Sequence, residues 1–175
     1  MAYVVCGLGS NKAFVKDGVL LEPPVILEKA CRKLSEILSE LKVSSIYSTK
    51  PMYVENQPSF FNMAASGFYD GDAFELLKKT QAIESLFGRN RAFEIRNGPR
   101  TLDIDIEIFG NETFNTVELE LPHPRLKERA FILIPLLEIY EESADIPERR
   151  MFEGYLSKLP EQGVELYGRI GSQRK

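Results

Sequence analysis

Residues 102–109 alternate acidic and aliphatic side chains. Successive side chains of a strand point to opposite faces, so Asp103, Asp105 and Glu107 share one face. Mg²⁺ takes oxygen ligands in proteins, usually one or two carboxylates completed by water and substrate phosphates. A carboxylate pair that bridges two metal ions suits a phosphoryl-type transfer. We therefore predict that Asp103 and Asp105 bind metal, with Glu107 at the margin of the site or structural.

The plainer interpretation of this acidic face is a solvated strand whose carboxylates lie opposite lysines. A D-x-D pair alone favours that interpretation. Here the other face of the strand is apolar and therefore buried, and arginines lie nearby in the sequence. This context favours the metal site.

Four arginines precede the acidic strand, in a chain of net charge −4: Arg89, Arg91, Arg96 and Arg100. Guanidinium groups bind phosphate oxygens in a bidentate way and stay charged. Each arginine alone favours a plainer interpretation, an exposed helix end with salt bridges to Glu84, Glu94 or the acidic strand. Together, beside a magnesium site, they favour an oligophosphate ligand, because they offset its charge and that of a transition state.

The segment GLGSN, residues 7–11, follows an apolar run but is not a phosphate-binding loop. It lacks the Walker A spacing, and Lys12 breaks the dinucleotide pattern G-x-G-x-x-G. It predicts a tight turn after a strand instead.

Two weaker signals concern ligands. Phe60 and Asn62 share a strand face if Phe61 is in the core, and an aromatic ring beside an amide suits a flat heterocycle. His123, the single histidine, lies in a rigid turn between two prolines. It is as well explained by structure as by contact with an anion or a ribose, and it has no nucleophile partner for a catalytic triad.

The elements that position these residues follow from periodicity and turn residues. We predict strands at 2–8, 42–50, 60–69, 102–109 and 164–167, and helices at 25–41, 72–87, 128–140 and 151–159, with Pro135 marking a kink or break. The order of the first six elements is strand, helix, strand, strand, helix, strand. That order predicts an α+β, ferredoxin-like, mostly antiparallel sheet with helices packed on it as three α/β/α layers.

Composition bounds the function. With 175 residues we expect a single domain, 1–175, with 141–175 as a C-terminal extension of unclear role. The acidic net charge argues against a general nucleic-acid binder. Two cysteines without a CxxC or Cys/His cluster indicate neither zinc nor disulfides, and no signal or membrane segment is evident. We expect a cytoplasmic protein without nucleic-acid or membrane partners.

A set of motifs resembles the 6-hydroxymethyl-7,8-dihydropterin pyrophosphokinase family of folate biosynthesis. The motifs are GLGSN, YSTKP, QPSFFN, GRNR, GPRTLDIDI and LPHPRLKERAF, in the family's order across about residues 3–140. The resemblance implies transfer of diphosphate from ATP to the pterin hydroxymethyl group, with release of AMP and with two Mg²⁺ ions. It also implies small-molecule substrates, a monomer or weak dimer, and neighbouring folate enzymes as candidate partners.

The resemblance assigns roles residue by residue. It implies metal ligands at Asp103 and Asp105, and catalytic arginines at Arg89, Arg91, Arg96 and Arg100. ATP contacts are implied at Gln81, Glu84, Arg91, Ile106, His123 and Arg129. The pterin pocket is implied at Thr49, Pro51, Met52, Phe60, Asn62, Asp103 and Phe131, with the ring between the two phenylalanines. The chain departs from the family at Asn97, at Glu118 and in an arginine loop one residue longer.

Two rival functions stay open on the sequence. A magnesium-dependent nucleotidyltransferase would also use paired acids on a strand, but it would transfer AMP and release diphosphate. A non-catalytic ferredoxin-like sensor of small molecules would leave the acids facing solvent. The first predicts a different product, and the second predicts no turnover.

Overall fold

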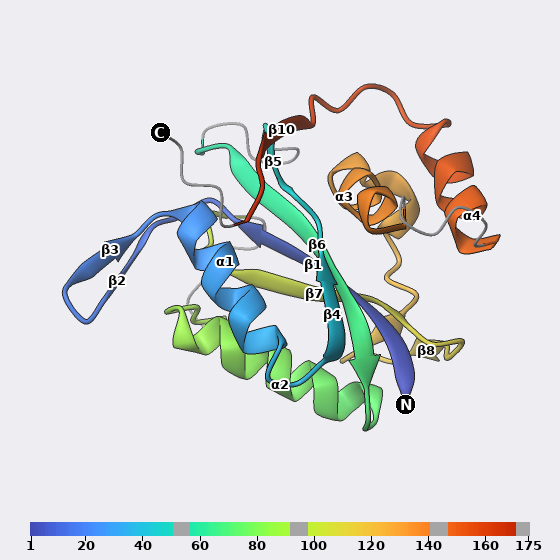
Figure 1. Cartoon of the computed structure of the whole chain (residues 1–175), viewed down its shortest axis with the longest axis horizontal. Coiled ribbons are helices and arrows are strands. Elements are labelled where there is room, and N and C mark those ends of the chain that lie inside the picture. Colours follow the sequence, from blue (N-terminus) through green and yellow to red (C-terminus); the bar gives the residue numbers. More distant parts are fainter. Residues whose placement is uncertain (51–56, 92–97, 141–146, 171–175) are drawn as a thin grey trace.

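The computed structural model describes residues 1–50, 57–91, 98–140 and 147–170. It shows one antiparallel sheet with helices on both faces (Figure 1). Its strands are β1 (Ala2–Ser10), β4 (Ser39–Val43), β5 (Ile46–Thr49), β6 (Phe60–Tyr69), β7 (Asp103–Phe109) and β10 (Glu165–Gly168). The helices are α1 (Pro23–Leu34), α2 (Ala73–Leu86), α3 (Ala130–Tyr140) and α4 (Pro147–Leu156). Smaller elements are the hairpin β2 (Phe14–Lys16) and β3 (Val19–Leu21), the pair β8 (Phe114–Asn115) and β9 (Glu120–Leu121), and a 3-10 helix, η1 (Leu126–Glu128).

The strand order in the sheet is β10-β5-β6-β1-β7, and β4 also pairs with β6. Every pair is antiparallel. The prediction of an α+β, ferredoxin-like sheet between helical layers is confirmed. Figure 1 shows α1 and α2 on one side of the sheet and α3 and α4 on the other.

Alternation along β1 separates the two cores. Val4, Cys6 and Leu8 pack beneath α1 and α2, whereas Val5 packs beneath α3. Gly7 and Gly9 therefore face the α3 side, and in the register of β1 with β7 they lie opposite Asp105 and Asp103. Directly opposed residues share a face of the sheet, so the register puts the acidic residues of β7 on the α3 side.

The predicted helix 25–41 is wrong beyond Leu34. A turn follows, Glu40 adopts a left-handed conformation with φ 50°, and the chain continues as β4 against β6. The periodic residue Leu38 is still buried, but it reaches the core from the turn. Pairing of the backbone with β6 outweighs the local helical pattern, because tertiary context overrides propensity.

The segment after β1, for which we predicted no helix or strand, contains the hairpin β2–β3, which projects from the body of the molecule (Figure 1). Its two-residue turn is Asp17-Gly18, with φ 51° and 77°. Asp-Gly is a strong sequence signal for such a turn, so the hairpin was predictable from this dipeptide. The tight turn predicted at residues 7–11 is also wrong, since β1 continues to Ser10 through both glycines.

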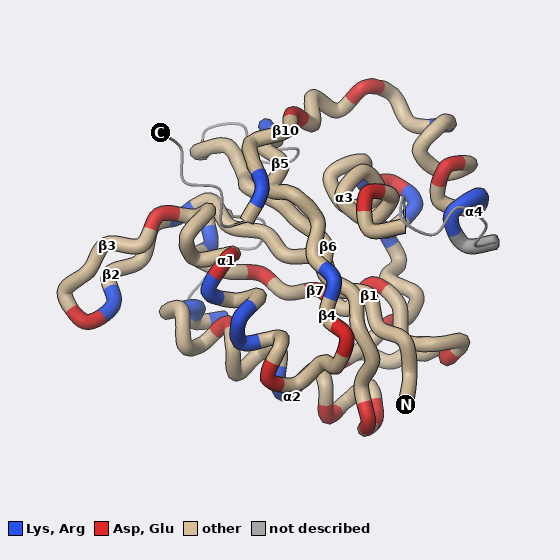
Figure 2. Tube along the Cα trace, viewed as in Figure 1, with Lys and Arg blue, Asp and Glu red and all other residues tan. Residues whose placement is uncertain are grey.

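The C-terminal elements differ in detail from their predictions. α3 runs through Pro135 without a break. α4 begins before residue 151 and ends at Leu156, and β10 pairs with β5 at the edge of the sheet. Within the described residues, no helix is long and apolar enough to cross a membrane. Figure 2 shows basic and acidic residues mixed along α1 and α2.

Candidate active site

The carboxylate of Asp103 is held by two arginines. Arg100 Nη1 donates to Oδ2 at 2.5 Å, and Arg89 forms an ion pair with Oδ1. Burial raises the pKa of Asp103, but Arg89 and Arg100 outweigh it and hold this pKa below its ordinary value. Asp103 is therefore a charged group whose two oxygens already have basic partners.

Asp105 lies one pleat further along β7 and contacts groups from the α3 side. Arg129 Nη1 donates to its Oδ2 at 3.3 Å, and His123 Nε2 lies 3.9 Å from the same oxygen. Burial and the neighbouring Asp103 raise the pKa of Asp105 to about 6. Two close carboxylates that repel each other in this way are suited to share a cation.

Glu84 of α2 connects the arginines to the back of β7. It accepts from Arg89 at 2.7 Å, from Arg91 through both Nε and Nη2, and from the main-chain N–H of Ile104 at 2.8 Å. The Arg89 side chain is 9% exposed and bridges Glu84 and Asp103, whereas that of Arg91 is 49% exposed. Arg89 is thus a buried brace, and Arg91 is the arginine of this pair that is open to a ligand.

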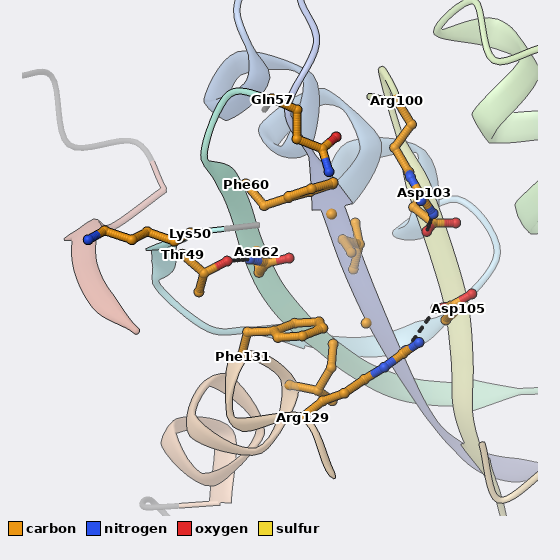
Figure 3. Close-up of a pocket in the computed structure, with 14 residues that line it drawn as sticks. Thr49, Lys50, Gln57, Phe60, Asn62, Arg100, Asp103, Asp105, Arg129 and Phe131 are labelled. Atoms are coloured by element: carbon orange, nitrogen blue, oxygen red, sulfur yellow. Dashed lines mark hydrogen bonds and ion pairs between the residues drawn. The ribbon is translucent and has the colours of Figure 1, made fainter. Parts of the chain in front are cut away.

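Figure 3 shows the rings of Phe60 and Phe131 on opposite sides of a pocket, with Asn62 and Thr49 between them. The buried Asn62 Nδ2 donates to Thr49 Oγ1 at 2.8 Å. Arg100 lies over the Phe60 ring and Arg129 over the Phe131 ring, at 5.9 and 5.7 Å from the centroids. The pocket is a slot for a flat group whose edge meets an amide and whose end meets the acids.

The floor of the slot is the bare backbone of β1. A Cβ on Gly7 would lie 2.6 Å from Ile132 Cδ1, and one on Gly9 would lie 3.2 Å from Asn62 Oδ1. We did not predict this role of the two glycines from the sequence. A glycine inside a strand signals close approach of another group, and two at alternate positions mark the same face.

Asn11, at the end of β1, joins two loops beside the slot. Its Oδ1 accepts from the main-chain N–H of Arg100 at 2.8 Å. Its Nδ2 donates to Gln57 Oε1 at 3.1 Å and to the carbonyl of Pro58 at 3.2 Å. No local pattern predicts these contacts, because they join residues far apart in the sequence.

Glu107 continues the acidic face beyond the site and is fully buried. Its carboxylate oxygens have no hydrogen-bond partner among the described residues, and Oε2 lies 3.8 Å from His123 Nδ1. Burial and Asp105 raise the pKa of Glu107 to about 8, whereas burial and Arg129 lower that of His123 to about 4. At neutral pH both side chains are therefore largely neutral.

The structure brings together most of the predicted site. One pocket is lined by Thr49, Phe60, Asn62, Arg100, Asp103, Asp105, Arg129 and Phe131, and also by Gly7, Leu8, Gly9, Lys50, Gln57 and Ile132. Gln81 lies apart, on α2, in hollows that it shares with Arg91 and Glu118. The side chain of Ile106 faces the core on the opposite side of β7. Pro51, Met52, Arg96 and Asn97 lie outside the described residues.

The carboxylates of β7 fit a magnesium ion only if substrate phosphates complete its coordination. Among the described residues, no group of three or more acidic, histidine or cysteine side chains forms a ready metal site. Asp103 and Asp105 provide two oxygen donors on one face, which is the usual protein share of a magnesium site completed by substrate phosphates. The nearby Arg91 and Arg100 suit those phosphates.

Comparisons with known proteins find similarity over most of this chain. A family model described as 7,8-dihydro-6-hydroxymethylpterin-pyrophosphokinase (HPPK) matches residues 5–141. The 2-amino-4-hydroxy-6-hydroxymethyldihydropteridine pyrophosphokinase of Bacillus subtilis is 50% identical over 144 residues, 81% of this chain and 79% of that protein. The Pseudomonas aeruginosa protein of the same name is 36% identical over 165 residues, 93% and 94% of the two chains.

A solved structure described as HPPK-DHPS in complex with substrates has a TM-score of 0.60 at 15% identity. The match covers 89% of this chain and 43% of that one, so this chain spans less than half of the solved protein. At that identity the likeness concerns the fold alone.

Proposed function

The chain belongs to the 7,8-dihydro-6-hydroxymethylpterin-pyrophosphokinase family, and from this premise we propose that the slot and the acids of β7 are its active site. The chain is a transferase that moves diphosphate from ATP to 6-hydroxymethyl-7,8-dihydropterin, giving AMP and the pterin diphosphate in folate biosynthesis. The observation that supports the location most directly is the placement of Asp103 and Asp105 at the end of the aromatic slot.

The pterin ring lies between Phe60 and Phe131 in this proposal. Aromatic stacking favours a flat ring, and the buried amide of Asn62 binds its hydrogen-bonding edge. Thr49 fixes the orientation of that amide. Pro51 and Met52, in the preceding loop, remain predicted parts of the pocket.

Asp103 and Asp105 would hold the two Mg²⁺ ions that the reaction is expected to use, with the phosphates of ATP completing their coordination. The ions, when bound, polarise the phosphoryl oxygens and offset their charge. Arg91 and Arg100 bind the phosphates, and Arg129, whose Nη1 lies 3.3 Å from Asp105 Oδ2, contacts them from the α3 side. Arg89 positions Asp103 from behind, and Arg96 stays a predicted member of the loop.

The remainder of ATP extends past the acids toward α2. His123 and Arg129 contact it on the α3 side, and Gln81, Glu84 and the main chain of Ile106 lie on the other. Glu118 lines a hollow beside Gln81. Its negative charge, where we expected the family to have a basic residue, weakens attraction for the nucleotide.

The transfer itself needs positioning more than proton abstraction. The hydroxymethyl oxygen attacks the β-phosphorus in line, the bond from that phosphorus to the α–β bridging oxygen breaks, and AMP leaves with this oxygen. The hydroxyl proton passes to solvent as the new bond forms. Charge spread over the phosphoryl oxygens is stabilised by the arginines, and such a loose transition state depends mainly on this stabilisation.

The whole chain acts as one domain in this proposal, because β10 pairs with β5 and α4 contacts α3. Its substrates are small molecules. We further propose a cytoplasmic monomer or weak dimer that works beside other folate enzymes.

The test is a product assay with ATP, Mg²⁺ and 6-hydroxymethyl-7,8-dihydropterin. The proposal requires equal amounts of AMP and pterin diphosphate, only with metal, and none from a folded Asp105→Ala variant. Release of free diphosphate would indicate adenylyl transfer. Binding of both substrates without any product would indicate a sensor.

A further inference from the structure

The side chain of Gln162 brackets the start of α3. Gln162 lies in the segment between α4 and β10. Its Oε1 accepts from the main-chain N–H of Ala130 at 2.9 Å, and its Nε2 donates to the carbonyl of Glu128 at 2.9 Å. The two bonds therefore hold the peptide groups on either side of Arg129.

These two hydrogen bonds form where main-chain groups have no partner within a helix. Ala130 is the first residue of α3, and the first N–H groups of a helix have no partner within the helix. Glu128 ends the preceding 3-10 helix. One amide thus satisfies both a donor and an acceptor that local structure leaves open, and it fixes the short joint between η1 and α3.

The joint carries two groups of the site. Arg129 reaches Asp105 at 3.3 Å, and Phe131 forms one wall of the slot. Neither side chain contacts Gln162 in a hydrogen bond, so Gln162 acts on both through the main chain. A rotation of the joint would move the aromatic wall and the guanidinium together.

The same segment also holds the opposite side of the slot. Just after Gln162, β10 pairs with β5, with Glu165 opposite Ser48. Tyr167 packs edge-on against Phe61 of β6 at 4.7 Å between ring centroids. β5 ends at Thr49 and β6 begins at Phe60, so residues 162–168 connect the strands that carry Thr49 and Phe60 to the helix that carries Phe131.

We propose that Gln162 is a positioning residue for the diphosphate transfer, which sets Arg129 and Phe131 relative to the rest of the slot. It touches no reacting atom. This inference rests on the proposed roles of Arg129 and Phe131, and it gives the C-terminal segment a function in the site.

The experiment compares full-length Gln162→Ala with Glu161→Ala, the exposed neighbour, in steady-state assays and thermal unfolding. We expect Gln162→Ala to raise KM for the pterin roughly tenfold, because the joint without its two hydrogen bonds must be ordered when the pterin binds, and tenfold corresponds to about 1.4 kcal/mol. Glu161→Ala should match the wild type. Gln162→Glu keeps the acceptor for Ala130 but places an oxygen against the Glu128 carbonyl, so we expect it to raise KM as well. A lower unfolding temperature with unchanged KM would show a merely structural role and overturn the inference.

A double-mutant cycle links the effect to the slot. If Gln162 acts through Phe131, the variant with both Gln162→Ala and Phe131→Ala should raise KM little more than Phe131→Ala alone. The same cycle with Arg129→Ala tests the second group, and multiplied effects in both cycles would overturn the inference. If Phe131→Ala and Arg129→Ala leave the kinetics unchanged, the proposed site itself fails. If they impair the enzyme while Gln162→Ala does not, this inference alone fails.

Discussion

The guanidinium of Arg100 donates to Asp103 Oδ2 at 2.5 Å, and this is an oxygen that the proposed magnesium site would use. Arg89 holds the other oxygen of the same carboxylate. In the absence of substrates the arginines thus neutralise the acid. In the proposed mechanism, binding of Mg²⁺ with ATP would exchange these partners, because the carboxylate would then bind the cation and Arg100 would bind the phosphates.

We predict that Arg100→Ala strengthens the binding of metal and weakens the binding of nucleotide. With the competing cation removed, Mn²⁺ alone should bind the protein at least roughly tenfold more tightly, since adjacent charges near a protein surface interact by several kcal/mol. A non-hydrolysable ATP analogue should bind more weakly. Electron paramagnetic resonance measures the first affinity and calorimetry the second. Asp103→Asn, which weakens the metal site, is the control, and weaker Mn²⁺ binding by Arg100→Ala would contradict the exchange.

The buried Glu84 should be far more important for stability than a surface acid on the same helix. Glu84→Gln removes the charge that Arg89 and Arg91 share, and we expect it to lower the free energy of unfolding by roughly 3 kcal/mol. Glu75→Gln breaks the exposed pair with Lys79 and should leave the free energy of unfolding almost unchanged, because water and salt screen such a pair. Urea unfolding followed by circular dichroism compares the two. A similar loss in the free energy of unfolding for both variants would mean that the buried Glu84 stabilises the protein no more than the exposed Glu75 does.

Stability of the metal-free protein should fall between pH 6.5 and 8. Folding raises the pKa of Glu107 from 4.5 to about 8, so the folded protein keeps a proton that the unfolded chain has released. Asp105, with a folded pKa of about 6, has nearly completed its change below this window, whereas the unfolded His123 side chain, with a pKa of 6.5, loses its remaining proton in the lower part of the window and offsets a small part of the loss. We expect a loss of roughly 2 kcal/mol across this window. Urea unfolding with a chelator present measures it.

The matched variant for this pH effect is Glu107→Gln, which cannot ionise. Its free energy of unfolding should stay level over the same window. A slope equal to that of the wild type would assign the pH effect to another group.

Removal of the Phe60 ring should weaken the binding of the pterin but not that of ATP. Phe60→Ala takes away a stacking surface, and we expect KM for the pterin to rise roughly tenfold or more while KM for ATP changes little. Leu20→Ala on the hairpin, where the leucine is 59% exposed, is the control of similar chemistry. Equal rises in both KM values would place Phe60 elsewhere than against the pterin.

Sequence patterns predicted the parts of the site that depend on local order. The alternation at 102–109 defined the acidic face of β7, and the order of elements predicted the sheet. Spacing could not show that Arg89 is buried between Glu84 and Asp103 while Arg91 is exposed, because that difference arises from the packing of α2 on β7.

Long-range hydrogen bonds were beyond such patterns. Asn11 reaches Arg100, and Gln162 reaches Ala130, across 89 and 32 positions. An asparagine or glutamine carries no signal of its partner. The helix predicted at 25–41 failed for a related reason, since β4 obtains its hydrogen bonds from β6.

The glycine floor of the slot has a consequence for inhibition. A competitive inhibitor that lies on Gly7 and Gly9 rests on main-chain atoms, which no substitution deletes. Any replacement there adds atoms, and even a methyl group on Gly7 would come within 2.6 Å of Ile132. Added atoms at Gly7 or Gly9 would displace Ile132 or Asn62, which both line the slot. A replacement that excludes the inhibitor therefore also changes the space for the substrate, and resistance by this route lowers the activity of the enzyme.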